Sequence, residues 1–168
     1  MPLLLDKACR QSDDLHPVDV GDAGVANDRV TTRLLDASAD DAALPVEAPA
    51  DVALLVFTLS AVPPERMANV LRLAHASLQK GGLLLFRDYA LYDLPQLRFA
   101  PGARLGKNLY RREDGTLAYF FSTADMQQRA CAAGFEVLEC KYACVINTNR
   151  RTGEALQRVF VHGVFQKS

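Results

Sequence analysis

Residues 51–88 contain two apolar runs of strand length on either side of an amphipathic segment. The first run, DVALLVFTLS (51–60), is almost continuously apolar, as is typical of a central parallel strand covered on both faces. Residues 64–80 begin with a proline, end before two glycines and repeat apolar side chains at spacings of three and four, which predicts a helix. The second run, LLLFRD (83–88), completes a right-handed β-α-β unit. The chain is therefore predicted to have an α/β fold.

Other parts of the chain have a weaker pattern. Residues 1–29 are mixed in composition and predict an irregular or degenerate N-terminal segment. A β-branched strand, VTTRLL (30–35), is expected to follow and to lead into Asp36. Residues 89–115 form a long polar and aromatic connection before a short strand over 116–122. A connection of that length in a compact domain is usually functional or disordered.

The C-terminal part predicts one helix and one hairpin. The helix is expected over 124–133, capped by Ser122 or Thr123 and stopped by the glycine that follows. Residues 135–147 and 155–167 alternate between apolar and polar side chains, which is typical of paired antiparallel strands. The sheet is therefore expected to end antiparallel.

The composition limits the classes of partner. With 19 basic and 20 acidic side chains the formal net charge is −1, so attraction to nucleic acid has to come from a local patch. No apolar run approaches the roughly 20 residues of a membrane helix, which predicts a soluble protein. The four cysteines match no zinc-ligand spacing, so no metal is expected. They predict reduced thiols in a cytoplasmic compartment, with mitochondria and the nucleus as open alternatives.

Charged and aromatic residues directly follow the second apolar run, in FRDYALYD (86–93). Ligands of α/β sheets bind beyond the carboxyl ends of parallel strands. Arg87, Asp88 and Tyr89 therefore lie where a site is expected. The residues alone leave an alternative open, in which Arg87 and Asp88 form a surface ion pair and the tyrosine packs under the loop.

Several ordered stretches resemble one family. FTLSAVPPERM, LLFRDYALYD, GKNLYRREDGTLAYFFS, TNRRTGE and QRVFVHGVFQK are similar to the methyltransferase-like enzymes that make 3-methylcytidine in tRNA anticodon loops. These belong to the class I S-adenosylmethionine-dependent methyltransferases. The resemblance runs from about residue 30 to the C-terminus and implies a partial methyltransferase domain over 30–168. Its fold would be a Rossmann-like sheet, mostly parallel, with an antiparallel C-terminal hairpin.

One part of the family pattern is not found in the sequence. The family holds the methionine and ribose of its cofactor with an E-x-G-x-G loop after the first strand and an acid after the second. Gly21 and Gly24, in VDVGDAG, lack the strand and helix that such a loop needs on either side. The domain is therefore expected to be N-terminally incomplete.

The resemblance implies roles for individual residues. The expected catalytic residues are Arg87, Asp88 and Tyr89: the carboxylate accepts from the exocyclic amine of cytosine, the guanidinium donates to O2 or a phosphate, and the tyrosine stacks. The implied contacts to S-adenosylmethionine are Asp36, Phe57, Leu59 and Ser60. The expected contacts to tRNA are Tyr92, Asp93, Lys107, Arg111, Arg112, Arg150 and Arg151. Plainer alternatives are a loop acid at Asp36, core packing at Phe57 and solvated charge at the basic residues.

The leading expectation is S-adenosylmethionine-dependent N3-methylation of cytidine in tRNA. The first alternative is a non-catalytic or incomplete RNA-binding module that needs a protein partner or a missing N-terminal segment. The second is a small-molecule methyltransferase, because the same fold hosts many acceptors.

Overall fold

The computed structural model describes residues 32, 34–44, 49–148, 153 and 155–168. The chain divides into two compact units, Met1–Asp36 and Ala37–Ser168, and all helices and strands given below belong to the second unit. The segment expected over 1–29 lies outside the described residues, as does most of the strand expected over 30–35. Leu34 and Leu35 are described and lie outside any strand, so the end of that strand prediction is wrong. Leu34 is 73% exposed, so burial in a sheet does not hold it extended.

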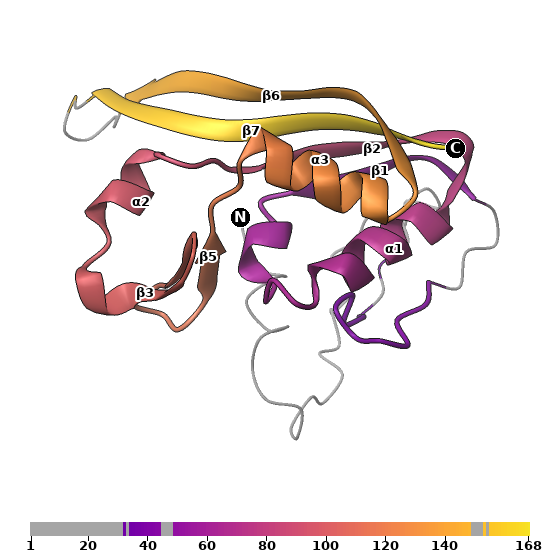
Figure 1. Cartoon of the computed structure of the whole chain (residues 1–168), viewed down its shortest axis with the longest axis horizontal. Helices are drawn as coiled ribbons and strands as arrows, with labels where there is room; N and C mark the ends of the chain where they lie inside the picture. Colours follow the sequence, from indigo (N-terminus) through magenta and orange to yellow (C-terminus); the bar gives the residue numbers. More distant parts are fainter. Residues whose placement is uncertain (1–31, 33, 45–48, 149–152, 154) are drawn as a thin grey trace, which may run out of the picture. The chain divides into compact units, whose positions relative to one another are not determined.

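The main sheet has the strand order β1-β2-β7-β6. β1 (Ala50–Val56) and β2 (Leu78–Tyr89) run parallel. β7 (Ala155–Lys167) pairs antiparallel with β2 on one side and with β6 (Phe135–Thr148) on the other. The structure confirms the predicted α/β fold, with its parallel β-α-β unit and its antiparallel C-terminal hairpin (Figure 1).

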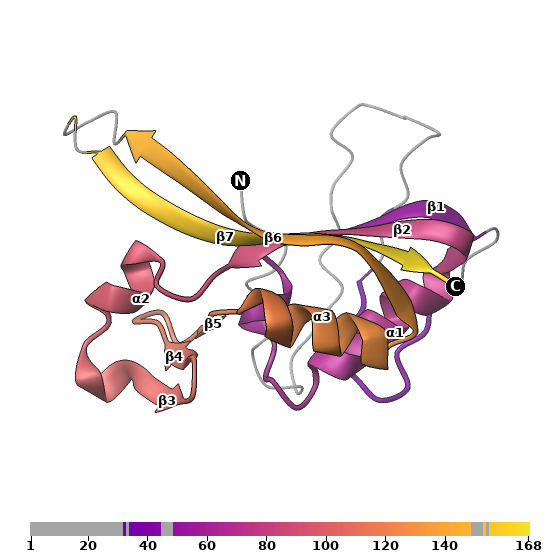
Figure 2. The same ribbon diagram turned by 45° about the horizontal axis from the view of Figure 1, so that its top comes forward.

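Two helices cover one face of this sheet (Figure 2). They are α1 (Met67–Ser77) and α3 (Thr123–Ala132). Ser122 caps α3 as predicted, because its hydroxyl oxygen accepts from the backbone N–H of Asp125 at 3.1 Å. The core lies between these helices and the sheet. Among its fully or nearly fully buried side chains are Met67, Val70, Leu71, Leu84, Phe86, Phe121, Met126 and Phe165.

The helix expected over 64–80 is shorter than predicted at both ends. It ends at Ser77, because Leu78 is the first residue of β2, where it is buried and pairs with Ala50. The glycines taken as the helix stop therefore lie within β2, and Gly81 adopts a φ of 80° there. Burial of Leu78 against the core outweighs the helical spacing that the sequence shows.

β1 differs from the prediction in its length and in its place. It ends at Val56 rather than at the end of 51–60, and the chain then enters a short 3-10 helix, Leu59–Ala61. Among the strands described, β1 lies at the edge of the main sheet. Leu54 is 66% exposed, and its neighbours Val52 and Val56 are also exposed. The prediction of a central strand covered on both faces is therefore wrong for this part of the chain, because no described element packs on these side chains.

The connection expected to be irregular contains several short elements. They are α2 (Leu94–Arg98), β3 (Arg104–Gly106) and β4 (Leu109–Arg111). With β5 (Leu117–Tyr119), the two strands form a second, three-stranded antiparallel sheet of order β3-β4-β5. The connection is thus ordered, and it places its aromatic and basic side chains beside the carboxyl end of β2.

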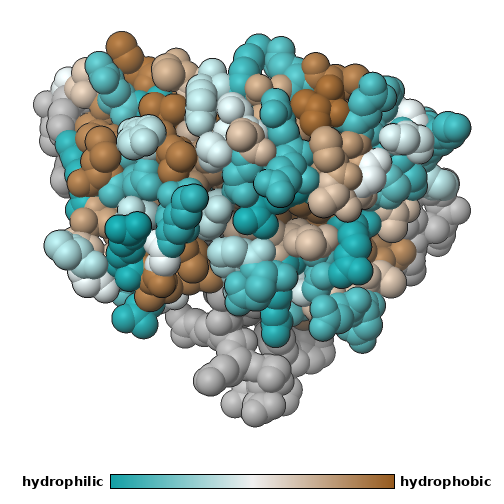
Figure 3. All heavy atoms as spheres, viewed as in Figure 1, coloured by the Kyte–Doolittle hydropathy of each residue, from teal (hydrophilic) through white to brown (hydrophobic). Residues whose placement is uncertain are grey.

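The hairpin of β6 and β7 extends past the ends of β1 and β2, and α2 lies against the β7 side of this extension (Figures 1 and 2). Hydrophobic residues reach the surface along the margin where β6 lies (Figure 3). The exposed apolar side chains of β6 are Leu138, Tyr142 and Ile146. No helix in the described part of the chain is long and apolar enough to cross a membrane.

Candidate functional site

A pocket of about 230 Å³ lies beside the carboxyl end of β2. Tyr89, the last residue of β2, forms part of its wall, and the remaining wall comes from α2, the β4–β5 region and β7. The lining residues are Tyr89, Pro95, Phe99, Arg112, Ala118, Phe120 and Arg158. Because β1 and β2 are parallel and end on this side of the sheet, the pocket occupies the place where α/β sheets bind ligands.

Aromatic rings make up much of the pocket wall. The ring centroids of Tyr89 and Phe120 are 5.8 Å apart, and those of Phe120 and Phe99 are 6.2 Å apart in an edge-to-face arrangement. Phe99 also stacks on Tyr110 at 4.8 Å with an interplanar angle of 16°. These mutual contacts fix the ring planes, and a planar ligand can stack against such rings.

The guanidinium groups of Arg112 and Arg158 both lie beside the Tyr89 ring. The Arg112 guanidinium carbon is 5.3 Å from the Tyr89 ring centroid, and that of Arg158 is 5.9 Å away. The pocket lining contains these two arginines and no carboxylate. The site therefore combines aromatic surface with positive charge, which suits a planar group next to an anion.

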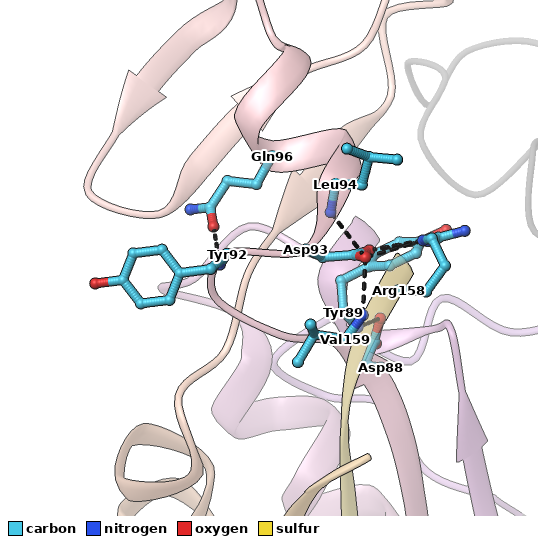
Figure 4. Close-up of polar contacts among 8 residues, drawn as sticks. All are labelled: Asp88, Tyr89, Tyr92, Asp93, Leu94, Gln96, Arg158 and Val159. Carbon is cyan, nitrogen blue, oxygen red and sulfur yellow. Dashed lines mark hydrogen bonds and ion pairs between the residues drawn. The ribbon is translucent and has the colours of Figure 1, made fainter. Parts of the chain in front are cut away.

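Asp93 holds Arg158 in place (Figure 4). Arg158 donates from Nε to Asp93 Oδ1 at 2.9 Å and from Nη2 to Oδ2 at 2.9 Å. Asp93 Oδ1 also accepts from the backbone N–H groups of Leu94 and Val159 at 3.0 and 2.9 Å. Asp93 is 0% exposed, so this expected substrate contact instead joins α2 to β7.

Asp88 lies in the core behind the pocket. It is 0% exposed and accepts from the backbone N–H of Ser60 at Oδ2 and from that of Tyr89 at Oδ1, both at 2.9 Å. Burial raises the pKa of Asp88 to about 6, although hydrogen bonds from Ser60 and Tyr89 and the charge of Arg112 act in the opposite direction. Asp88 thus fixes the backbone on which Tyr89 stands and is not part of the pocket lining.

Phe57 contacts Tyr89 from outside the pocket lining, and Arg87 lies beside Phe57. Phe57 follows β1 with a φ of 52°, a strained value for a residue other than glycine, and its ring centroid is 5.2 Å from that of Tyr89. The guanidinium carbon of Arg87 is 4.6 Å from the Phe160 ring centroid and 5.8 Å from that of Phe57. Arg87 and Asp88 do not form the surface ion pair considered from the sequence, because Asp88 is buried and bound to backbone N–H groups.

A wider depression of about 640 Å³ adjoins the pocket. Pro95, Phe99 and Arg112 line both. The depression adds Arg98 and Arg111, together with the carboxylates of Glu113 and Asp114. A ligand longer than a single ring can therefore continue from the pocket past more guanidinium groups.

The structure brings together part of the predicted site. Tyr89 and Arg112 line the pocket, and Arg111 lines the depression next to it. Phe57 packs against Tyr89, and Arg87 lies beside Phe57 and Phe160, whose rings do not line the pocket.

Other predicted residues lie elsewhere. Tyr92 is 76% exposed, and its ring points away from the Asp93–Arg158 pair (Figure 4). Lys107 is exposed between β3 and β4 and lines neither hollow. Arg150 and Arg151 lie outside the described residues.

The sequence prediction missed Arg158, Phe99 and Phe120. Arg158 carried a weak signal, because it is the one charged residue in the mostly apolar strand segment LQRVFV. Phe120 belongs to a segment that was predicted only as a strand. Phe99 follows α2, and nothing in its sequence neighbourhood indicates that it meets Phe120.

The residues expected to contact the cofactor fall in both units of the chain. Leu59 and Ser60 are buried, and Ser60 donates its N–H to Asp88. Asp36 belongs to the other unit of the chain. Phe57 is the remaining residue of that set, and its exposed ring offers stacking but no polar contact.

A family model described as a methyltransferase domain matches residues 6–140. A curated relative from Pongo abelii, the tRNA N(3)-cytidine methyltransferase METTL6, is 41% identical over 117 residues, which cover 70% of this chain and 42% of the relative. O-methyltransferase 3 of Dictyostelium discoideum is 41% identical over 119 residues, which cover 70% of this chain and 27% of the relative. The chain thus spans about two fifths of the length of the tRNA-modifying relative and less of the other.

A solved structure shows the same fold. The crystal structure of an S-adenosylmethionine-dependent methyltransferase from Clostridium acetobutylicum matches with a TM-score of 0.54, over 81% of this chain and 64% of that chain, at 10% identity. The family match, which covers most of the sequence, agrees with the parallel β1–β2 pair and the antiparallel end of the sheet. The chain therefore belongs to the methyltransferase domain family.

Proposed function

We propose that the chain is an S-adenosylmethionine-dependent methyltransferase that forms N3-methylcytidine in tRNA, and that the described residues form the acceptor side of its site. The observation that carries this proposal is the pocket at the carboxyl end of β2, with rings from Tyr89, Phe99 and Phe120 and guanidinium groups from Arg112 and Arg158. The identity to a tRNA N(3)-cytidine methyltransferase supports the choice of acceptor.

The pocket chemistry suits an unpaired base. Cytosine N3 lies on the Watson-Crick edge, so a base that reacts there has to leave its pair and lie with its face against a ring. Its N3 is a neutral nitrogen with a free lone pair, so alignment with the methyl donor supplies much of the rate and no strong base is required. Tyr89 would supply the stacking surface, the buried ring of Phe120 would support Tyr89 from behind, and Arg112 would contact the phosphate or O2.

The depression next to the pocket suits the RNA backbone. Arg111 and Arg112 line it, and their positive charge can follow phosphates even though the net charge of the chain is −1. The role of Arg87 as a donor to the base, and that of Asp88 in catalysis, remain predictions. The burial of Asp88 supports a positioning role, in which it fixes the backbone of Tyr89.

Family membership implies S-adenosylmethionine as the methyl donor. The described residues supply only Phe57 on the side expected to face it, so further contacts would have to come from residues outside the described part of the chain. The thiols of Cys131, Cys140 and Cys144 are free, which supports a reducing, cytoplasmic compartment.

A methylation assay tests the proposal. The chain is incubated with methyl-labelled S-adenosylmethionine and tRNA, the tRNA is digested to nucleosides, and label in 3-methylcytidine is measured. We expect Tyr89→Ala to lower incorporation about tenfold or more, because base stacking on an aromatic side chain is worth about 1–3 kcal/mol. Tyr89→Phe should stay close to wild type, since the ring remains.

Tyr142→Ala is the matched control, because Tyr142 is an exposed tyrosine of β6 that does not line the pocket. Label found on protein or small molecules and never at cytidine N3 would contradict the proposed function.

A second candidate is an incomplete RNA-binding module that needs another polypeptide to hold the donor. The exposed Val52, Leu54 and Val56 of β1 favour it. So does the lack of a recognisable E-x-G-x-G loop in the sequence. Calorimetry with S-adenosylhomocysteine separates the two candidates. Micromolar binding by this chain alone would argue against the module, whereas no binding would support it.

A third candidate is a methyltransferase of small molecules, which the similarity to O-methyltransferase 3 favours. The same labelled assay, with small aromatic acceptors in place of tRNA, tests it. Transfer to such acceptors without transfer to tRNA would support this candidate.

A further inference from the structure

Arg158 is a pocket residue that lies 65 positions after the carboxylate that holds it. Its guanidinium engages Asp93 through Nε and Nη2, so Nη1 is the nitrogen that Asp93 does not engage. Its guanidinium carbon lies 5.0 Å from the Phe160 ring centroid and 5.9 Å from that of Tyr89. Three hydrogen bonds to Asp93 and two neighbouring rings therefore fix both the position and the plane of this group.

The charge of Arg158 is neutralised where it stands. Asp93 is fully buried, and the Arg158 side chain is only 20% exposed, so water screens the pair poorly. The hydrogen bonds that Arg158 donates to Asp93 raise the pKa of Arg158 above its ordinary value, so the guanidinium stays charged. The pair therefore gives the pocket wall a fixed planar group with an N–H donor at Nη1 that Asp93 does not engage, but it adds almost no net charge to the pocket.

Arg112 differs from Arg158 in this respect. It lines the same pocket, and its guanidinium carbon is 5.3 Å from the Tyr89 ring centroid. Of the salt bridges between described residues, none involves Arg112. Its charge acts on the carboxylates of Asp88 and Asp114 without forming a salt bridge with either, so it can still attract an anionic ligand.

We propose that the two arginines divide the work of binding: Arg158 is a positioning residue that fixes the pocket wall, and Arg112 supplies the charge that attracts phosphate. The inference rests on the proposed function, because it takes an RNA nucleotide as the ligand. Arg158 aligns the base against Tyr89. The Asp93–Arg158 pair takes no part in the electrostatic attraction of the RNA.

The salt dependence of RNA binding tests this division. The probe is a fluorescein-labelled cytidine hexanucleotide, titrated with the full chain and followed by fluorescence anisotropy between about 50 and 200 mM salt. For single strands the slope of log K against log salt changes by about 0.7 for each phosphate contact. Arg112→Gln is therefore expected to reduce the slope by about 0.7.

The double variant Asp93→Asn/Arg158→Gln removes both charges of the pair and leaves the net charge of the chain unchanged. We expect it to weaken binding about tenfold, as the loss of one stacked base does, and to leave the slope as in wild type. Arg158→Lys keeps the charge but loses the planar fork, and it is expected to weaken binding with the same unchanged slope. Arg66→Gln is the control, because Arg66 is exposed before α1 and lines neither hollow.

Circular dichroism melts show which variants fold, and Arg158→Lys provides the test if the double variant does not. A slope reduced by about 0.7 in the double variant would overturn the inference, since Arg158 would then contact phosphate. Affinity equal to wild type in folded Arg158→Lys would overturn it as well, because the pair would then be structural alone. Failure of the wild-type chain to bind the hexanucleotide would also overturn the inference.

The proposed function is judged separately, by label at cytidine N3 in tRNA. If the hexanucleotide behaves as expected and no tRNA is methylated, the inference stands and the proposed function fails. If tRNA is methylated and the double variant keeps wild-type affinity, the proposed function stands and the inference fails.

Discussion

The backbone N–H of Ser60 donates to the carboxylate of Asp88 at 2.9 Å. This bond joins the segment after β1 to the end of β2, and both residues are buried. A second N–H, that of Tyr89, donates to the other oxygen of the same carboxylate. The two parallel strands are therefore tied together directly beneath the pocket, and the position of Tyr89 depends on this carboxylate.

Asp88 is expected to make stability depend on pH. Its pKa is raised by burial to about 6 in the folded chain and is about 4 in an unfolded one. The folded state thus binds the extra proton, so the contribution is full below about pH 4 and is lost as pH rises through about 6. We expect the difference in unfolding free energy between wild type and Asp88→Asn to change by about 3 kcal/mol between pH 4 and pH 7, in that direction.

Urea denaturation of both proteins across that range measures the difference. Taking the difference removes the contributions of other titrating groups, such as His75 and His162, whose pKa values burial lowers. A difference that stays constant with pH would show that Asp88 is ionised as easily in the folded chain as in the unfolded one.

Ser122→Ala is expected to lower the unfolding free energy by about 1 kcal/mol, because it removes the acceptor for the Asp125 N–H at the start of α3. Ser122→Asp should keep most of the stability, since aspartate is also a good N-cap residue. Thermal melts of the two variants test the cap. Equal melting temperatures for wild type and Ser122→Ala would mean that another group satisfies this N–H.

Gly163→Ala is expected to destabilise the chain by about 1–3 kcal/mol, because overpacking a core forces side chains off their rotamers. A Cβ at Gly163 would lie 2.4 Å from the ring of Phe165, which is fully buried and cannot move aside freely. Gly102→Ala is the matched control, since a Cβ there meets no atom within 4 Å. Denaturant melts that rank the two variants equally would contradict the packing described for β7.

Leu54→Lys is expected to reduce self-association without lowering the melting temperature. Leu54 is an exposed apolar residue on an edge strand, and a lysine on such a strand disfavours pairing with another chain. Leu105→Lys adds the same charge at an exposed position of β3 and serves as the control. Light scattering at increasing protein concentration measures the effect. Equal scattering from both variants would show that β1 is not the contact.

Local patterns predicted the elements that are stabilised by their own residues. The β-α-β unit, the Ser122 cap and the final hairpin follow from periodicity and from turn residues, and the structure confirms them. Tyr89 and Arg112 were also assigned to the site, because ligands of α/β sheets bind at strand ends and basic loop residues attract nucleic acid, and both residues line the pocket.

Tertiary contacts decide what the sequence did not predict. The strands β3 and β4 are three residues long, and such short elements form only where neighbours hold them. Asp93 reads as a polar loop residue, yet its partner is Arg158, which lies in a strand far along the chain. The sequence around Asp93 gives no sign of Arg158, and the sequence around Arg158 gives no sign of Asp93. The pocket wall that this pair joins could therefore not be predicted from local sequence.

The Asp93–Arg158 pair also has an evolutionary consequence. Loss of either partner alone would leave a buried charge unpaired, which commonly lowers the unfolding free energy by about 3–5 kcal/mol. Joint replacement by uncharged residues can be nearly neutral. Selection therefore acts on positions 93 and 158 as a unit. Among homologous chains the two positions are expected to change together, so a covariation signal between them would reveal the joined wall without any coordinates.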